Sequence, residues 1–251
     1  MRRFLAGLAV AIALVPAAFA DTLNSRSAEA RLTLGYRVAS DAIQALLPSG
    51  WTLNDRGPDT PNLSVTLTDR ALYQDAQARP IAGGRTRDVI FTSSASNAAK
   101  ETRTFVILTL SPERATPGPY GVSIPATFET RSTTVTGADD KPKSELQWSV
   151  KTVEGGALDI LVRYSRGAVS RSRSPEAGVR VYSAKTPDFY RIYKTESGSD
   201  PISTPADRSR LETATLKAAG PRLAKLFDGS ERLITVTETP YYLREVWLPE
   251  G

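Results

Sequence analysis

The sequence predicts a mainly-β domain, built as a closed or partly closed antiparallel β-barrel with a few short helices; a β-sandwich is the alternative architecture. Three features support this prediction. Short apolar or alternating runs recur along the chain, turns rich in Pro and Gly separate them, and only two stretches have helical spacing. The 251 residues include 17 Gly and 17 Pro, which supply turns for that many strands.

The first 20 residues have the pattern of a secretory signal peptide. Met1-Arg2-Arg3 is positively charged, Phe4 to Val15 is apolar, and Ala18-Phe19-Ala20 is a small-x-small cleavage site. We expect cleavage after Ala20 and a periplasmic or secreted protein, with residues 21–251 forming one mainly-β domain. No later stretch reaches the roughly 20 apolar residues that a membrane-spanning helix needs, so we expect no transmembrane segment after cleavage.

The strands and helices follow from local patterns. After a polar start we expect a strand at 31–36 and a short helix that Ser40 caps and Pro48 ends. Residues 63–67 alternate apolar and polar, as a half-buried strand does, whereas 102–110 is almost continuously apolar, as a strand covered on both faces would be. Further strands are expected at 88–93, 126–136, 144–153, 157–164, 179–184, 189–195, 232–238 and 241–248, with a second short helix at 221–227.

The ranges 126–136 and 144–153, separated by GADDKPK, predict a β-hairpin. A symmetric loop would place Glu129 opposite Lys151 on the polar face of this hairpin, where opposite charges attract mildly. The apolar face is centred on Trp148 and is expected to face the core.

The amino-acid composition excludes several kinds of site. The chain has no His and no Cys, so Ser-His-Asp and Cys-His nucleophilic sites, disulfides, and thiolate or imidazole zinc sites are impossible. The net charge of +5 includes Arg2 and Arg3, and the remaining +3 is too mild to indicate nucleic-acid binding. We therefore expect no metal, no cofactor and no nucleic acid, and any acid–base chemistry would depend on Asp, Glu, Lys or Tyr.

Tyr36 to Trp51 reads YRVASDAIQALLPSGW and is followed by the run NLSVTLTDRALYQD, which ends at Asp75. This segment resembles the N-terminal part of the acetoacetate decarboxylase-like superfamily, and a looser similarity appears at PYGVSIPATFETR, residues 119–131. The resemblance implies a cone-shaped, closed β-barrel around an internal apolar cavity.

In the decarboxylases of that superfamily, a lysine in a Gly-x-Pro-Lys-Lys context forms a Schiff base with the substrate ketone, and a neighbouring cation lowers its pKa. The corresponding segment here, which begins at Tyr120, reads YGVSIPAT and lacks both lysines; no Lys-Lys pair occurs anywhere in the chain. The resemblance therefore does not extend to the activity. Lys151 is the candidate for a displaced nucleophile, although a solvated surface pair with Glu129 is the simpler interpretation.

These patterns give a set of candidate binding residues and no catalytic or metal-binding residue. The candidates are Tyr120, Glu129, Arg131, Trp148 and Lys151. The basic, serine-rich segment 163–180 could contact an anionic envelope component through Arg166, Arg171 and Arg173, although such segments are more often solvated loops. The aromatic residues that could line a pocket, although their strand spacing favours the core, are Tyr241, Tyr242 and Trp247.

Three hypotheses for the function follow. The first is an exported, non-catalytic β-barrel-like protein that binds a small, largely apolar ligand in an internal cavity. The second is a lyase or decarboxylase of the acetoacetate decarboxylase-like superfamily that uses a displaced lysine such as Lys151. The third is an envelope interaction protein that works through its basic loop.

Overall fold

The computed structural model describes residues 21–137 and 142–249, and these form thirteen strands, two short α-helices and one 3-10 turn. The strands, in chain order, are β1 (Thr22–Arg37), β2 (Trp51–Leu53), β3 (Leu63–Asp75), β4 (Thr86–Asn97), β5 (Thr102–Ser111), β6 (Ser123–Thr136), β7 (Pro142–Thr152), β8 (Ala157–Ser165), β9 (Ser170–Arg173), β10 (Val179–Ser183), β11 (Tyr190–Ser203), β12 (Leu211–Ala219) and β13 (Arg232–Leu248). The helices are α1 (Ser40–Gln44) and α2 (Leu223–Leu226), and the 3-10 turn is Glu113–Ala115. None of the helices in the described residues is long and apolar enough to cross a membrane.

Seven of the strands close into a barrel. Their order is β5-β10-β11-β13-β1-β3-β4, and β4 pairs with β5 to complete the ring. Neighbours in the ring are antiparallel except β10 and β5, which are parallel. Closure leaves the barrel strands paired on both sides, and it decides between the two architectures that the sequence left open: the barrel prediction is confirmed.

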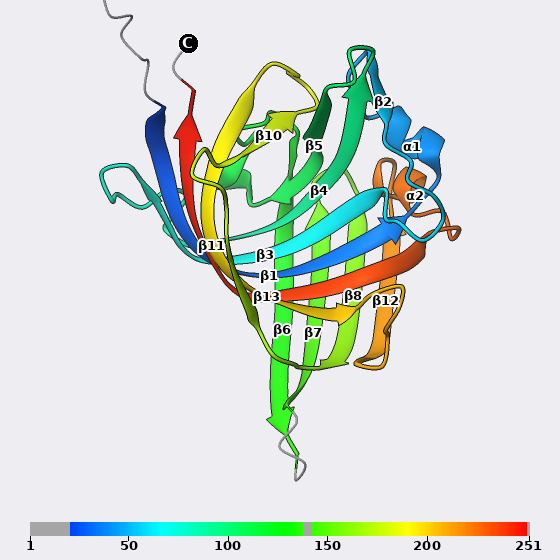
Figure 1. The fold of residues 1–251 in the computed structure, drawn as a ribbon. Helices are drawn as coiled ribbons and strands as arrows, with labels where there is room; N and C mark the ends of the chain where they lie inside the picture. Colours follow the sequence, from blue (N-terminus) through cyan, green and yellow to red (C-terminus); the bar gives the residue numbers. More distant parts are fainter. Residues whose placement is uncertain (1–20, 138–141, 250–251) are drawn as a thin grey trace, which may run out of the picture.

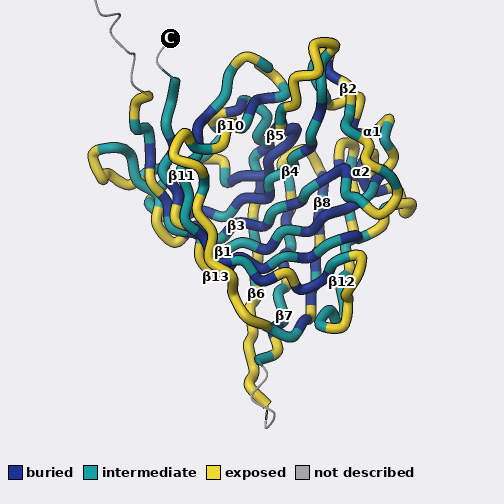
Figure 2. Tube along the Cα trace, in the orientation of Figure 1, coloured by how far each residue is buried: buried dark blue, intermediate teal, exposed yellow. Residues whose placement is uncertain are grey.

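A second, four-stranded antiparallel sheet consists of β6, β7, β8 and β12 and joins the barrel through a short parallel pairing of β5 with β6. Figure 1 shows its strands running behind β3, β1 and β13 and crossing their direction. In Figure 2 the buried positions gather where these two layers overlap. One continuous hydrophobic core, which contains residues from both layers, lies there.

The two faces of strand β4 are covered in different ways. Val89 and Phe91 are fully buried in the hydrophobic core, which also contains Trp148 of the second sheet. Asp88 and Ile90, which point the other way because side chains alternate along a strand, line a cavity inside the barrel. The two faces of one strand therefore have different roles: one packs the core and the other forms the wall of the cavity.

Several elements differ from the sequence-based expectations. β1 begins at Thr22, not at residue 31, because the polar segment before residue 31 pairs with β13 on one side and β3 on the other. Residues 232–248 form one continuous strand where two were expected, since β1 and β11 pair along both halves of it. β12 was not expected, and part of the basic segment forms β9 against β11.

Two local predictions were wrong in detail. Helix α1 begins at Ser40 as expected, but the N-cap residue is Ala39 and no side chain caps the helix; the Ser40 hydroxyl donates instead to Asp55, at 3.3 Å. In the β6–β7 hairpin, Glu129 lies opposite Ser149 and Lys151 opposite Thr127, a register two residues away from the symmetric one. Because side chains alternate with a period of two, this shift changes the cross-strand partners but not the faces.

Candidate ligand-binding cavity

The barrel encloses a cavity of about 320 Å³, whose wall consists of residues from all seven barrel strands and from the loop between β5 and β6. One water molecule occupies ~30 Å³ in the liquid, so this volume suits a small organic molecule and lies at the lower end of ligand pockets. Apolar side chains such as Val106 and Val181 form part of the wall, but Arg31, Arg70 and Asp88 also line it. The wall is thus mixed rather than apolar.

A buried carboxylate, that of Glu29 on β1, holds three of the arginines at the cavity. Its oxygens lie 2.6 Å from Arg31 Nη2, 2.8 Å from Arg70 Nε and 2.9 Å from Arg244 Nη2. The Ser27 hydroxyl donates a further hydrogen bond to Glu29 at 2.6 Å. Burial alone would raise the pKa of Glu29, but the charges of Arg244, Arg31 and Arg70 outweigh it and hold that pKa well below its usual value of 4.5. Glu29 is therefore ionised at neutral pH.

A second acid, Asp88 on β4, extends this network. Arg70 Nη1 lies 2.5 Å from Asp88 Oδ2 and donates a hydrogen bond to the Thr86 hydroxyl at 2.6 Å. Arg70 thus bridges Glu29 and Asp88 across β1, β3 and β4. Its guanidinium carbon also lies 4.8 Å from the centre of the Tyr73 ring, in a cation–π contact. Arg70 is thereby held by two carboxylates and one hydroxyl, and these bonds fix the orientation of its guanidinium.

Arg191 on β11 is the exception among the cavity arginines. Only 5% of it is exposed, and one of its terminal nitrogens donates a hydrogen bond to the Asn24 side chain. Its Nε is buried without a hydrogen-bond partner, and within residues 21–137 and 142–249 no carboxylate forms an ion pair with it. Four arginines and two acids thus surround the cavity, which leaves an excess of two positive charges in the part of the chain that the structure describes.

Two tyrosine hydroxyls meet beside these cations. Tyr120 OH and Tyr193 OH form a hydrogen bond, and the Arg244 guanidinium carbon lies 5.0 Å from the centre of the Tyr193 ring. Burial, with a smaller effect from Tyr193, raises the pKa of Tyr120 well above its usual value of 10, although Arg191 and Arg244 oppose the shift. The Tyr120 hydroxyl therefore stays protonated at neutral pH and can donate a hydrogen bond to an anion beside the arginines.

The structure places the candidate binding residues from the sequence in different environments. Tyr120 lines the cavity. Trp148 is buried in the hydrophobic core against Phe128, and Glu129, Arg131 and Lys151 are exposed on the second sheet. These four residues do not line the cavity, and their role in binding stays a prediction.

The cavity wall bears on the displaced-lysine hypothesis as well. Among the described residues that line the cavity, none is a lysine. The described residues also contain no group of three or more acidic side chains that could hold a metal ion. The arginine, aspartate and hydroxyl side chains of this wall can recognise charged and hydrogen-bonding groups.

The basic segment is largely neutralised by pairing. Arg166 forms two hydrogen bonds with Glu238, at 2.6 and 3.0 Å. Arg171 and Arg173 both pair with Glu196, at 2.5 and 2.7 Å. Contact of these arginines with an anionic envelope component stays a prediction.

The residues that surround the cavity were mostly missed from the sequence. Tyr242, one of the aromatic candidates, does line the cavity, with the Arg31 guanidinium carbon 3.6 Å from its ring centre. Glu29, Arg70 and Asp88 were not singled out, because no motif connects them. The available signal was strongest for Asp88, which stands at the start of a predicted strand, where a charge is unusual unless it is paired; Glu29 and Arg70 lie two and three residues outside the predicted strands.

Comparisons with known proteins agree on the fold. No family model and no curated protein matches the chain. The enduracididine biosynthesis enzyme MppR, solved with the condensation product of pyruvate and imidazole 4-carboxaldehyde, is similar over 96% of this chain and 95% of its own, with 11% identity and a TM-score of 0.56. An acetoacetate decarboxylase-like enzyme from Sphingomonas wittichii RW1 is similar over 97% and 100%, with 11% identity and a TM-score of 0.53.

The acetoacetate decarboxylase of Legionella pneumophila is similar over 92% of this chain and 86% of its own, with 13% identity and a TM-score of 0.51. The protein thus has the acetoacetate decarboxylase-like fold, as the resemblance in its sequence predicted. At identities this low the likeness establishes the fold, and the function has to be argued from the cavity.

Proposed function

We propose that this protein is an exported, non-catalytic binding protein that holds a small organic acid in its barrel cavity, with the carboxylate of the acid at Arg191. The observation that carries the proposal is the Arg191 guanidinium, which is buried, has a free Nε and forms no ion pair within the described residues. A buried cation without an anion is costly, and a ligand carboxylate that accepts its N–H groups would remove that cost.

The surroundings of Arg191 support an anionic ligand in preference to a largely apolar one. The excess of two positive charges favours an anion, and the Tyr120 hydroxyl adds a donor beside them. Arg31, Arg70 and Arg244 are committed to Glu29, so Arg191 has the donor that a carboxylate can take without breaking an existing pair.

The non-catalytic part of the proposal is supported by the groups at the cavity. A Schiff-base mechanism needs a lysine, and no described lining residue is one. A general base needs a pKa near the working pH, whereas three arginines hold the pKa of Glu29 well below 4.5. The Asp88 carboxylate is ion-paired with Arg70.

Isothermal titration of the purified protein with hexanoate and with 1-hexanol tests the carboxylate site. We expect hexanoate to bind at least about tenfold more tightly than 1-hexanol, because an ion pair with a buried arginine contributes more binding free energy than a single neutral hydrogen bond does. Arg191→Gln should remove this preference. The matched control is Arg26→Gln, since Arg26 is half exposed and pairs with Glu245 away from the cavity. Equal binding of acid and alcohol, or an unchanged preference in Arg191→Gln with an unchanged melting temperature, would contradict the proposal.

Mass spectrometry of the protein from a periplasmic extract tests export and occupancy together. A denatured mass that corresponds to residues 21–251 supports cleavage after Ala20, and a native mass with a small excess that disappears on denaturation supports a bound ligand. A denatured mass that retains residues 1–20 contradicts the export.

A further inference from the structure

We propose that the acid is a polyhydroxylated one: a short chain with several hydroxyl groups and one terminal carboxylate, as in a sugar acid. This inference rests on the proposed function, since it takes the carboxylate at Arg191 as given. It concerns the opposite wall of the same cavity, which determines what the remainder of the ligand must be.

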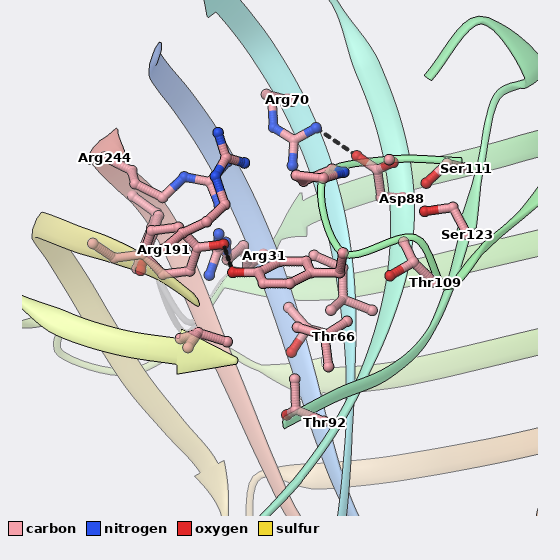
Figure 3. Close-up of a pocket in the computed structure, with 18 of the residues that line it drawn as sticks. Arg31, Thr66, Arg70, Asp88, Thr92, Thr109, Ser111, Ser123, Arg191 and Arg244 are labelled. Atoms are coloured by element: carbon pink, nitrogen blue, oxygen red, sulfur yellow. Dashed lines mark hydrogen bonds and ion pairs between the residues drawn. The ribbon is translucent and has the colours of Figure 1, made fainter. Parts of the chain in front are cut away.

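The lining away from Arg191 carries hydroxyl groups that the protein itself does not use; Figure 3 shows Thr109, Ser111 and Ser123 near Asp88 and Thr92 beside Thr66. Thr92 on β4, Thr109 and Ser111 on β5, and Ser123 at the start of β6 all line the cavity. In the part of the chain that the structure describes, none of these four side chains forms a hydrogen bond. Thr66, which also lines the cavity, differs because it bonds to Thr33 at 3.2 Å.

Burial makes these free hydroxyls significant. Ser111 is 3% exposed and Thr109 is 8% exposed, so each faces the cavity rather than bulk solvent. Burying a hydroxyl without a partner costs free energy, and an alkyl chain against this wall would displace water and leave all four groups unpaired. A chain with its own hydroxyls can replace that water group for group, because each hydroxyl both donates and accepts.

Asp88 gives the same wall an acceptor. Its contacts with Arg70 and Thr86 use Oδ2, and within residues 21–137 and 142–249 no hydrogen bond or ion pair uses Oδ1. A carboxylate oxygen can accept a hydrogen bond from a ligand hydroxyl, whereas an alkyl group offers it no donor and a second carboxylate would repel it.

The two kinds of recognition lie on opposite sides of the cavity. In Figure 3, Arg191 and Arg244 stand on one side, while Asp88, Ser111, Ser123 and Thr109 stand on the other. A ligand that satisfies both sides has its charge at one end and its hydroxyl groups along the remainder. The geometry therefore selects a hydroxylated monocarboxylate over a fatty acid of the same length.

Three probes separate this inference from the proposed function. Gluconate and hexanoate have the same number of carbons and the same charge and differ in hydroxyl groups, and sorbitol has the hydroxylated chain without the carboxylate. By isothermal titration we expect gluconate to bind at least about tenfold more tightly than hexanoate, a factor that one or two net hydrogen bonds provide. Sorbitol should bind more weakly than gluconate by a similar factor.

Variants of the hydroxyl wall locate the effect. The double variant Thr109→Val with Ser111→Ala removes two hydroxyls at nearly constant side-chain size, and it should bring gluconate to within about threefold of hexanoate without weakening hexanoate. Thr127→Val is the control, because Thr127 is exposed on the second sheet and lies outside this cavity. Thermal melts of both variants check that the fold is retained.

Each outcome bears on one of the two proposals. Hexanoate binding as tightly as gluconate would overturn the hydroxylated ligand and leave the carboxylate site standing. Sorbitol binding as tightly as gluconate would overturn the carboxylate site. An unchanged preference for gluconate in the folded double variant would show that this wall does not select the ligand and would overturn the inference.

Discussion

Replacing Glu29 with Gln tests whether the buried ion network holds the barrel together at its cavity. The substitution keeps the size of the side chain and removes the charge that Arg31, Arg70 and Arg244 share, at 2.6, 2.8 and 2.9 Å. Arg70 would keep Asp88, but Arg31 and Arg244 have no other acidic partner among the described residues. Two guanidinium groups with little exposure would therefore lose the one counter-charge that the described residues give them.

Removing one partner of a buried ion pair costs about 3–5 kcal/mol, because the other charge stays buried. For a chain of this size each kcal/mol lowers the melting temperature by about 2–4 °C, so we expect Glu29→Gln to melt roughly 10 °C below the natural protein. Circular dichroism melts at pH 7 measure the shift, and urea titrations measure the free energy of unfolding. The matched control is Glu245→Gln, whose pair with Arg26 is exposed and is worth at most about 1 kcal/mol.

A melting temperature of Glu29→Gln equal to that of Glu245→Gln would refute this reasoning. It would mean that water in the cavity solvates Arg31 and Arg244 well enough to replace the carboxylate. Addition of a high chloride concentration gives a second check, since anions that enter the cavity should restore part of the lost stability of Glu29→Gln and none in the control.

Three further predictions concern pH, backbone strain and catalysis. The folded protein holds the pKa of Glu29 below 4.5, so the stability that this carboxylate adds is complete above about pH 4.5 and is lost as the pH falls through the lowered pKa. From pH 6 to pH 3 the melting temperature of the natural protein should therefore fall more steeply than that of Glu29→Gln. Parallel curves would contradict this. Gly220→Ala should cost more stability than Gly229→Ala. Both glycines have positive φ (+93° and +97°), but an added Cβ at Gly220 would lie 2.5 Å from the Gly156 backbone, whereas at Gly229 it would meet open space. Equal losses of unfolding free energy in urea titrations would refute the clash. Treatment with pyruvate and borohydride, which traps a Schiff base, should give no covalent adduct by mass spectrometry, because no described lysine lines the cavity. An adduct on Lys151 would restore the displaced-lysine hypothesis.

The parts of the fold that could be predicted from sequence are those with a local pattern. The alternation at 63–67 and the apolar run at 102–110 identify β3 and β5, since the burial of one or both faces of a strand is written in neighbouring residues. β12, with the sequence LETATLKAA, was missed because it is an edge strand in which small, polar and charged residues separate the two leucines, and it is partly exposed along its length. The polar start of β1 was missed because its burial depends on partners in β3 and β13.

The candidate site follows the same division. Tyr120 was named from its place in a segment that resembles the acetoacetate decarboxylase-like proteins, and it lines the cavity. Trp148 was assigned correctly to the core, and its apolar neighbours on the hairpin gave the signal. Arg191 was missed, because a single arginine in a strand has no local feature that distinguishes a buried, unpaired cation from a solvated one.

By itself, the sequence determined what chemistry is absent: without His or Cys, several kinds of catalytic and metal site are impossible. It also showed the alternation that identifies a polar face on β3. Only the tertiary structure decided that this polar face lines a cavity inside the barrel, and that Glu29, Arg70 and Arg244 meet there from β1, β3 and β13. The physical reason is that strand order and barrel closure depend on pairings between residues far apart in the chain, which no local pattern contains.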